Sequence, residues 1–332
     1  VLAFSLVGCG SEPAEEPAGE ESGDLEPVTL SLAFSAADAS PTGLAAKELK
    51  AMIEEKSEGK ITIDIYPDAQ LGGDRELIEG AQNENIDIIS MTTAPLVNFI
   101  PELAVFDMPM VFSDIETARA VMDGGYYQEL EGMFETAGLK LLMANPDSFR
   151  QMSSNIPVYE LADFDGIKIR TMENKYHMAF WEELGATPTP LAFGELYIAL
   201  QQGLVHAQEN PYATLIASKL NEQQDYVLDT NHIMFLNTTS INENVFNNLP
   251  EEYQNILTES FEEAREIAFE ISREEDQKAL DEVVEAGTEF IEVSDELRAE
   301  MQEAAKPVYE MIAEEIGQDS VDALFEAIEE VQ

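Results

Sequence analysis

The sequence predicts an α/β protein built from two lobes. Strand-like and helix-like segments alternate through residues 28–90 in the order strand, helix, strand, helix, strand, which is typical of a mainly parallel sheet with helices on its faces. The chain of 332 residues is longer than most single domains. Residues 251–286 contain neither Gly nor Pro, and one helix of that length would extend about 50 Å. Because this exceeds the width of one lobe, we expect the helix to span both.

The expected strands follow from apolar residues at every second position and from the turn residues between segments. Residues 60–66, for example, alternate between apolar and polar side chains and stop at Pro67, as a half-buried strand does. We expect strands at 28–34, 60–66, 86–90, 139–144, 149–153, 166–171 and 204–208, one or two within 225–240, and one near 289–293.

The expected helices begin and end at residues that favour helix termini. Pro41 suits the first turn of a helix that ends before Gly59, and Gly203 ends another helix. The apolar segment 106–112 is interrupted by Pro109, so we expect a loop there. We expect the other helices near 74–83, 114–122, 126–137, 174–184, after Pro211, and at 251–286, 295–316 and 320–331.

The strand at 166–171 carries an unusual charge for this chain. It holds Lys168 and Arg170 on one face, although the chain has 67 acidic and 17 basic residues and a net charge of −50. An Arg at the carboxyl end of an apolar strand needs an anionic partner, and its planar fork grips a carboxylate through two parallel hydrogen bonds. Composition alone favours an internal salt bridge over a ligand as that partner.

Other candidate ligand-binding residues follow strands. Ligands of such sheets bind beyond the carboxyl ends of the strands, which here places residues 35–38 and 91–93 near a site. Thr92 could donate its hydroxyl to a ligand or cap a turn. Asn210 stands between a strand and Pro211; it either caps the following helix or offers its amide to a ligand, and the two interpretations are evenly supported.

Composition and missing motifs argue against several functions. The acidity argues against nucleic-acid binding, because phosphates would be repelled. The chain lacks the G-x-S-x-G, G-x-x-x-x-G-K-[ST] and H-E-x-x-H motifs, so the sequence favours a protein that is not an enzyme. The three histidines fall in different elements, and we expect packing or surface roles for them. We expect neither a cofactor nor a metal ion.

The first residues predict export and anchoring. Cys9, the single cysteine, follows the apolar residues 1–6 and the pair Val7-Gly8, a pattern that resembles the lipobox of bacterial lipoprotein signal peptides. We therefore expect residues 1–8 to be the remnant of a signal peptide and residues 9–26 to be a lipidated, acidic tether, because the tract is rich in Glu, Pro, Gly and Ala. The expected location is extracytoplasmic, with membrane contact through the lipid alone.

Several short motifs, in a fixed order over residues 28–330, resemble one family: the extracytoplasmic solute receptors of tripartite ATP-independent periplasmic (TRAP) transporters, of the dicarboxylate-receptor type. The matching pieces are Tyr66-Pro67, Gln70-Leu71-Gly72, Asp74-Arg75-Glu76-Leu77, Val105-Phe106-Asp107-Met108-Pro109, Phe149-Arg150, Asp165-Gly166-Ile167-Lys168-Ile169-Arg170, Leu184-Gly185-Ala186, Gly194-Glu195-Leu196-Tyr197-Ile198-Ala199-Leu200-Gln201 and Gln208-Glu209-Asn210-Pro211.

The resemblance implies a periplasmic-binding-protein-like fold. Its two lobes, each a mixed sheet flanked by helices, would comprise residues 27–147 plus about 236–275, and 148–235 plus about 276–332. It further implies that Arg170 grips the ligand carboxylate, with Asn210 supporting it. Arg150 would contact the ligand or hold the cleft, and Phe193 would pack on the ligand.

The function implied is the capture of a small organic-acid anion between the lobes and its delivery to membrane permease subunits. The protein is expected to be a monomer. His206-Ala207 before the Gln-Glu-Asn-Pro motif depart from the family pattern. The residues at 91–95 are uncharged, unlike those of receptors of this type for sialic acid, which argues against that ligand. A dicarboxylate, keto acid or sugar acid fits better. The alternatives are a solute-sensing lipoprotein that serves a signalling receptor and an enzyme on the same scaffold.

Overall fold

The computed structural model describes residues 25–332. The expected signal-peptide remnant, Cys9 and nearly all of the tether 9–26 lie outside the described residues. The strand–helix alternation predicted near the N-terminus is present as β1 (Val28–Ala33), α1 (Pro41–Lys56), β2 (Ile61–Tyr66), α2 (Asp74–Gln82) and β3 (Ile88–Thr92). No helix in the described part of the chain combines the length and apolar character needed to cross a membrane.

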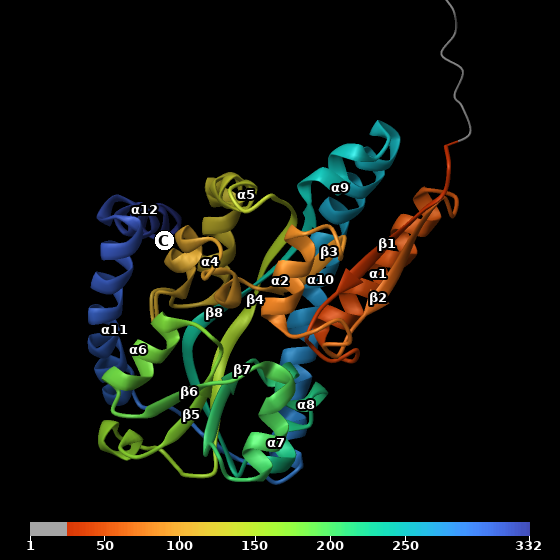
Figure 1. Cartoon of the computed structure of the whole chain (residues 1–332). Helices are drawn as coiled ribbons and strands as arrows, with labels where there is room; N and C mark the ends of the chain where they lie inside the picture. The colour runs from red at the N-terminus through yellow and green to blue at the C-terminus, as the bar shows by residue number, and fades with distance from the viewer. Residues whose placement is uncertain (1–24) are drawn as a thin grey trace, which may run out of the picture.

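Two long antiparallel strands, β4 (Leu139–Ser154) and β8 (Tyr226–Asn242), run through the centre of the molecule (Figure 1). The described strands form one mixed sheet in the order β2-β1-β3-β8-β4-β7-β5-β6, with β9 (Glu289–Ile291) also on β8. Parallel β1, β2 and β3 join one end of the long pair, whereas β7 (Ala207–Asn210), β5 (Lys168–Thr171) and β6 (Thr187–Pro190) join the other. The half-sheets therefore share β4 and β8.

The single strand β4 differs from the two strands expected at 139–144 and 149–153. The pair Asn145-Pro146 signalled a break, because Pro cannot donate to a strand ladder. The register shifts between Pro146 and Ser148 instead, so Asp147 is the extra residue of a bulge, a place that tolerates proline. The segment 225–240 likewise forms one strand, β8.

Strands β6 and β7 also differ from expectation. The sequence Thr187-Pro188-Thr189-Pro190 gave no strand signal, yet β6 pairs with β5 at the end of the sheet; such an edge position is where proline is tolerated in a strand. The strand expected at 204–208 occurs at Ala207–Asn210, which brings Asn210 into the sheet opposite Gln151 of β4.

The long helix α10 (Glu251–Glu285, 35 residues) connects the two ends of the sheet, as predicted from its length. Its first half packs Leu257 and Phe261 against side chains of β1, β2 and α1. Its last turns pack Ala279 and Val283 against Leu196, Leu200 and Leu215. The helix therefore braces both halves, which agrees with the predicted two-lobed architecture.

The remaining helices cover the faces of the sheet. In α11, a 22-residue helix that contains Pro307, buried residues face α6 and the central core. The helical segments not yet given are α3 (Thr93–Leu96), η1 (Pro101–Asp107), α4 (Ile115–Val121), η2 (Met122–Tyr126), α5 (Tyr127–Glu135), η3 (Leu161–Phe164), α6 (Lys175–Glu183), η4 (Phe193–Glu195), α7 (Leu196–Gln201), α8 (Tyr212–Ala217), η5 (Leu220–Gln223), α9 (Glu243–Asn248), α11 (Asp295–Ile316) and α12 (Gln318–Val331).

Candidate functional site

Arg170 is buried on β5, with a side chain that makes no ion pair among residues 25–332. Its Nε and Nη2 donate to the carbonyl oxygen of Leu191, at 2.9 and 2.6 Å. Its Nη1 is buried and has no hydrogen-bond partner. Burial lowers the pKa of the guanidinium to about 10, so the group remains cationic at neutral pH. Within residues 25–332, the internal salt bridge that composition favoured does not form at Arg170.

Arg150, on β4, is held by the chain itself. Its Nε forms an ion pair with Oε2 of Glu209, while Nη2 donates to Oε1 and to the backbone carbonyl of Glu209, at 3.0 and 2.6 Å. Nη2 also donates to Oδ1 of Asn210 at 3.0 Å, and Nη1 is buried without a partner. Arg150 therefore holds the site together while one of its nitrogens stays free.

Glu209 is the counter-ion of Arg150 in this network. The His232 ring nitrogen Nε2 lies 3.1 Å from Oε2 of Glu209, and His232 in turn stacks on Phe180, with 5.9 Å between the ring centroids. Burial alone would raise the pKa of the Glu209 carboxyl, but the charge of Arg150 and the hydrogen bonds from His232 and Arg150 lower it. Glu209 is therefore ionised, and it balances one guanidinium of the two.

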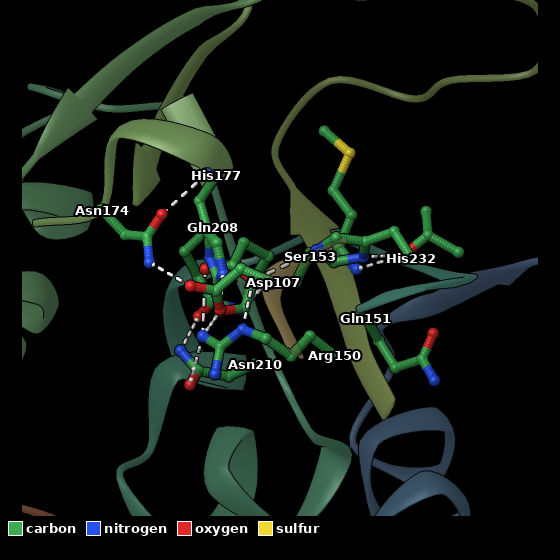
Figure 2. A network of polar contacts seen from close by, with 12 residues as sticks. Asp107, Arg150, Gln151, Ser153, Asn174, His177, Gln208, Asn210 and His232 are labelled. Atoms are coloured by element: carbon green, nitrogen blue, oxygen red, sulfur yellow. Dashed lines mark hydrogen bonds and ion pairs between the residues drawn. The ribbon is translucent and has the colours of Figure 1, made fainter. Parts of the chain in front are cut away.

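Asn210 does not cap the helix that follows it. The N-cap residue of α8 is Pro211, without a side-chain cap bond. The Asn210 amide instead accepts from Arg150 through Oδ1 and donates through Nδ2 to Oε1 of Gln208 at 2.6 Å. The capping interpretation is thus wrong for the side chain, and the amide orients Arg150 (Figure 2).

The five ligand-binding residues predicted from the sequence line one cavity. It has a volume of about 60 Å³, well above the roughly 10–15 Å³ that a single water needs. The Arg170 guanidinium carbon lies 5.9 Å from the centre of the Phe193 ring. The predicted residues that line it are Thr92, Arg150, Arg170, Phe193 and Asn210.

The free nitrogens of Arg150 and Arg170 make this cavity suited to an anion. Buried donors are almost always hydrogen-bonded in proteins, and leaving one unsatisfied costs about 1–3 kcal/mol, more for a charged group. Both Nη1 atoms belong to side chains that line the same cavity. An anion with two acceptor oxygens would satisfy both.

Several polar side chains of the cavity were not predicted as ligand-binding from the sequence, among them Asp74, Asp147 and Asn237. Asp74, at the start of α2, accepts a hydrogen bond from Ser35, and burial raises the pKa of its carboxyl. Asp147 and Asn237 each bury an Oδ1 that has no partner. Asp74 belongs to one of the family motifs and Ser35 to the predicted strand end, so these could have been found; Asp147 was hidden by the supposed break in β4.

A second buried network ties the apolar segment after α3 to α6. Asn174 donates to Oδ2 of Asp107 at 2.6 Å, and Nε2 of His177 lies 3.0 Å from Oδ1 of the same carboxylate (Figure 2). Asn174 also caps α6 by accepting from the backbone of Tyr176 and His177. This network is structural: none of its members lines the cavity, and His177 has the packing role expected for the histidines.

Comparison with known proteins identifies, over most of the chain, the same receptor family that the sequence motifs resemble. Residues 32–316 match the family described as bacterial extracellular solute-binding protein, family 7. The chain is 32% identical over 304 residues to the C4-dicarboxylate-binding periplasmic protein DctP of Rhodobacter capsulatus, with 90% of each chain covered.

Solved structures show the same fold. The sugar acid binding protein DctPAm of Advenella mimigardefordensis, in complex with galactonate, superposes with a TM-score of 0.90 at 28% identity, covering 93% of this chain and 100% of that one. A TRAP periplasmic solute binding protein of Polaromonas, bound to D-erythronate, gives a TM-score of 0.85 at 30% identity, with 90% and 98% covered. The chain therefore belongs to the bacterial extracellular solute-binding proteins of family 7, the receptors of TRAP transporters.

Proposed function

We propose that this protein is an extracytoplasmic receptor that binds the carboxylate of a small organic acid in the central cavity and delivers it to the permease subunits of a TRAP transporter. The observation that carries the proposal is the pair of buried guanidinium groups, of Arg150 and Arg170, each with a free Nη1 at one cavity. A carboxylate can accept from both, and such charge-assisted hydrogen bonds are roughly twice as strong as neutral ones.

The relatives support the choice of a carboxylate. The ligands named for them, C4-dicarboxylates, galactonate and D-erythronate, differ in length and in hydroxyl groups but share at least one carboxylate. In this chain Arg170 would bind that group, with Arg150 as the second donor. Asn210 would fix the orientation of Arg150, Phe193 would pack on the bound acid, and Thr92 would contribute its hydroxyl.

We place the hinge between the lobes in β4 and β8. The boundaries expected at 147/148 and 235/236 meet at one pair of residues, since Ser148 is opposite Phe235 in the sheet register. The register shift next to Ser148 interrupts the ladder there, and both residues line the cavity. Closure of the halves around a ligand would exclude water and strengthen its pairing with Arg170. No chemical step is needed.

A thermal-shift screen of organic acids tests this function. A true ligand at 100 times its Kd raises the free energy of unfolding by about 2.7 kcal/mol, which is worth several degrees of Tm in a chain of this size. Mass spectrometry of each stabilising acid after incubation should recover it unchanged. A broad panel of mono- and dicarboxylates without any shift would refute the function, and conversion of an acid would favour an enzyme.

We further propose that the receptor is a monomer anchored through a lipid on Cys9. The support is the lipobox-like sequence before Cys9 and the acidic tether after it. Cys9→Ser should move the protein from the membrane fraction to the soluble fraction when it is expressed in a bacterial host behind a lipoprotein signal sequence, whereas Ser11→Ala should not. Equal membrane association of both variants would contradict the anchor.

A further inference from the structure

The central cavity has a second polar end, made of acceptors rather than donors. Asp147 and Asn237 are each 7% exposed, line the cavity, and bury an Oδ1 without a hydrogen-bond partner. The large majority of buried side-chain polar atoms in proteins have a hydrogen-bond partner. A ligand that fills the cavity would therefore meet donors from Arg150 and Arg170 and acceptors from Asp147 and Asn237.

The sheet register separates these two ends. Arg150 and Asp147 are three residues apart on β4, about 10 Å along a strand. Asn237 on β8 is paired with Asn145, two residues before Asp147, so it lies next to the acceptor end. Arg170 and Asp74 also line a neighbouring cavity on one side, whereas Asp147 also lines a surface groove together with Asp276. A short carbon chain, with a hydrogen bond of about 2.8 Å at each end, can bridge such a separation.

The bulge in β4 is what turns Asp147 toward the cavity. The extra residue of a bulge is unpaired, and bulges next to binding sites commonly redirect one side chain. Asp147 is that extra residue, between Pro146 and Ser148 in the register with β8. A regular strand at this point would pair Asp147 within the ladder. The bulge instead leaves Asp147 unpaired, and Asp147 lines the cavity.

Of the described residues that line the cavity, none at the acceptor end is a cation; Arg273 and Lys278 line the adjoining surface groove. Two arginines and two aspartates are the charged residues that line the cavity, and both arginines lie at the donor end. Burial, and after it the charge of Asp276, raise the pKa of Asp147 well above its ordinary value. A second ligand carboxylate placed here would be buried without a counter-ion, a costly arrangement. A ligand hydroxyl can donate to either unpartnered oxygen.

We propose that Asp147 is a specificity-determining residue that binds a hydroxyl of the ligand's tail, with Asn237 beside it. The receptor then takes hydroxylated monocarboxylates of the sugar-acid class and discriminates against dicarboxylates. This inference rests on the proposed function, since it presupposes a carboxylate bound at Arg150 and Arg170.

Two matched pairs of acids test the proposal by calorimetry. Gluconate and glucarate share one hydroxylated six-carbon chain and differ in a terminal hydroxyl against a terminal carboxylate; 4-hydroxybutyrate and succinate differ in the same way. Wild-type protein should bind the hydroxyl member of at least one pair at least tenfold more tightly than its dicarboxylate partner. Asp147→Ala should lower the affinity for that hydroxyl member about tenfold and leave the affinity for its dicarboxylate partner within threefold of wild type. The variant should therefore no longer discriminate between the two acids. Asp64→Asn, at an exposed position on β2, should change neither affinity.

The outcomes separate this inference from the proposed function. If the dicarboxylates bind as well or better, or if Asp147→Ala weakens both members equally, the inference is overturned while the receptor function stands. If no carboxylate of a broad panel binds wild-type protein, both fail. Should Asp147→Ala not fold, Asp147→Asn keeps the shape and replaces the carboxyl group with an amide whose nitrogen can donate to a carboxylate. It should raise the affinity for glucarate or succinate relative to the hydroxyl partner; an unchanged ratio would count against the proposal.

Discussion

Replacing Arg170 by Ala removes the residue whose buried nitrogen most needs an anionic partner. Its Nε and Nη2 donate to the carbonyl oxygen of Leu191, whereas its Nη1 is buried without a hydrogen-bond partner. Truncating one side of a buried charge pair costs about 2–5 kcal/mol. At about 1.4 kcal/mol per tenfold, we expect Kd for a bound carboxylate to rise by about 30-fold to several thousand-fold.

The stability of the ligand-free protein should change much less than the affinity. Arg170→Ala leaves the carbonyl of Leu191 without its donors, which costs about 1–3 kcal/mol. It also removes a buried cation that has no ion-pair partner in the described chain, and burial disfavours that cation, as the pKa lowered to about 10 indicates. These effects oppose each other. Loss of binding without comparable loss of stability would therefore show that Arg170 acts on the ligand.

The assay is isothermal titration calorimetry with whichever acid stabilises wild-type protein, alongside urea unfolding without ligand. Arg170→Lys keeps the positive charge but lacks the planar guanidinium that can donate to the Leu191 carbonyl and to a ligand carboxylate at the same time. The affinity of this variant should therefore lie between those of wild type and Arg170→Ala. Lys306→Ala, which removes a 60% exposed surface cation paired with Glu303, controls for net charge. An Arg170→Ala protein that binds within threefold of wild type would refute the reasoning.

Two further predictions concern stability. Glu209→Gln leaves Arg150 buried without its counter-ion, so it should lower the free energy of unfolding by about 3–5 kcal/mol in urea titrations; a loss below 1 kcal/mol would contradict the central role of this pair. Asp276 accepts from the backbone nitrogen of Ala213, and burial raises the pKa of its carboxyl to about 6, above the ordinary 3.8. The folded state therefore holds this proton more tightly than the unfolded state, and stability is lost as pH rises from about 4 through 6. Asp276→Asn should gain about 3 kcal/mol over wild type across that window, and a difference that does not change with pH would argue against it.

The order of elements and the main cation of the site could be predicted from the sequence because they depend on local signals. Periodicity gave β1, β2 and β3 and the helices between them, and the absence of Gly and Pro gave the length of α10. The position of Arg170 at the end of a strand could also be predicted from neighbouring residues. The partner of Arg170 could not, because the acidic residues able to reach it are distributed along the whole chain.

The features of the site that could not be predicted from the sequence depend on tertiary contacts. The pairing of Arg150 with Glu209, 59 residues away in sequence, follows from the neighbouring strands β4 and β7 and has no local signal. A helix cap was an equal candidate for Asn210 because its role as a partner of Arg150 exists only in the folded sheet. The Asn-Pro-Asp sequence at 145–147 resembles a turn, and only the pairing of β4 with β8 shows a bulge that places Asp147 in the cavity.

The excess of acid over the whole chain and the capture of an anion are compatible because different residues determine them. The net charge of −50 comes largely from exposed carboxylates on helices such as α10 and α11, and at 0.1 M salt their fields decay over about 10 Å. Inside the cavity Glu209 forms its ion pair with Arg150, and burial raises the pKa of the two aspartates of the lining, Asp74 and Asp147, which disfavours their charged forms. Arg170 therefore carries a positive charge without an ion pair among the described residues, in a poorly solvated place where an interaction with a carboxylate is screened far less than at the surface. The surface charge would then slow the approach of an anion at low salt, while the buried pair would determine how long it stays.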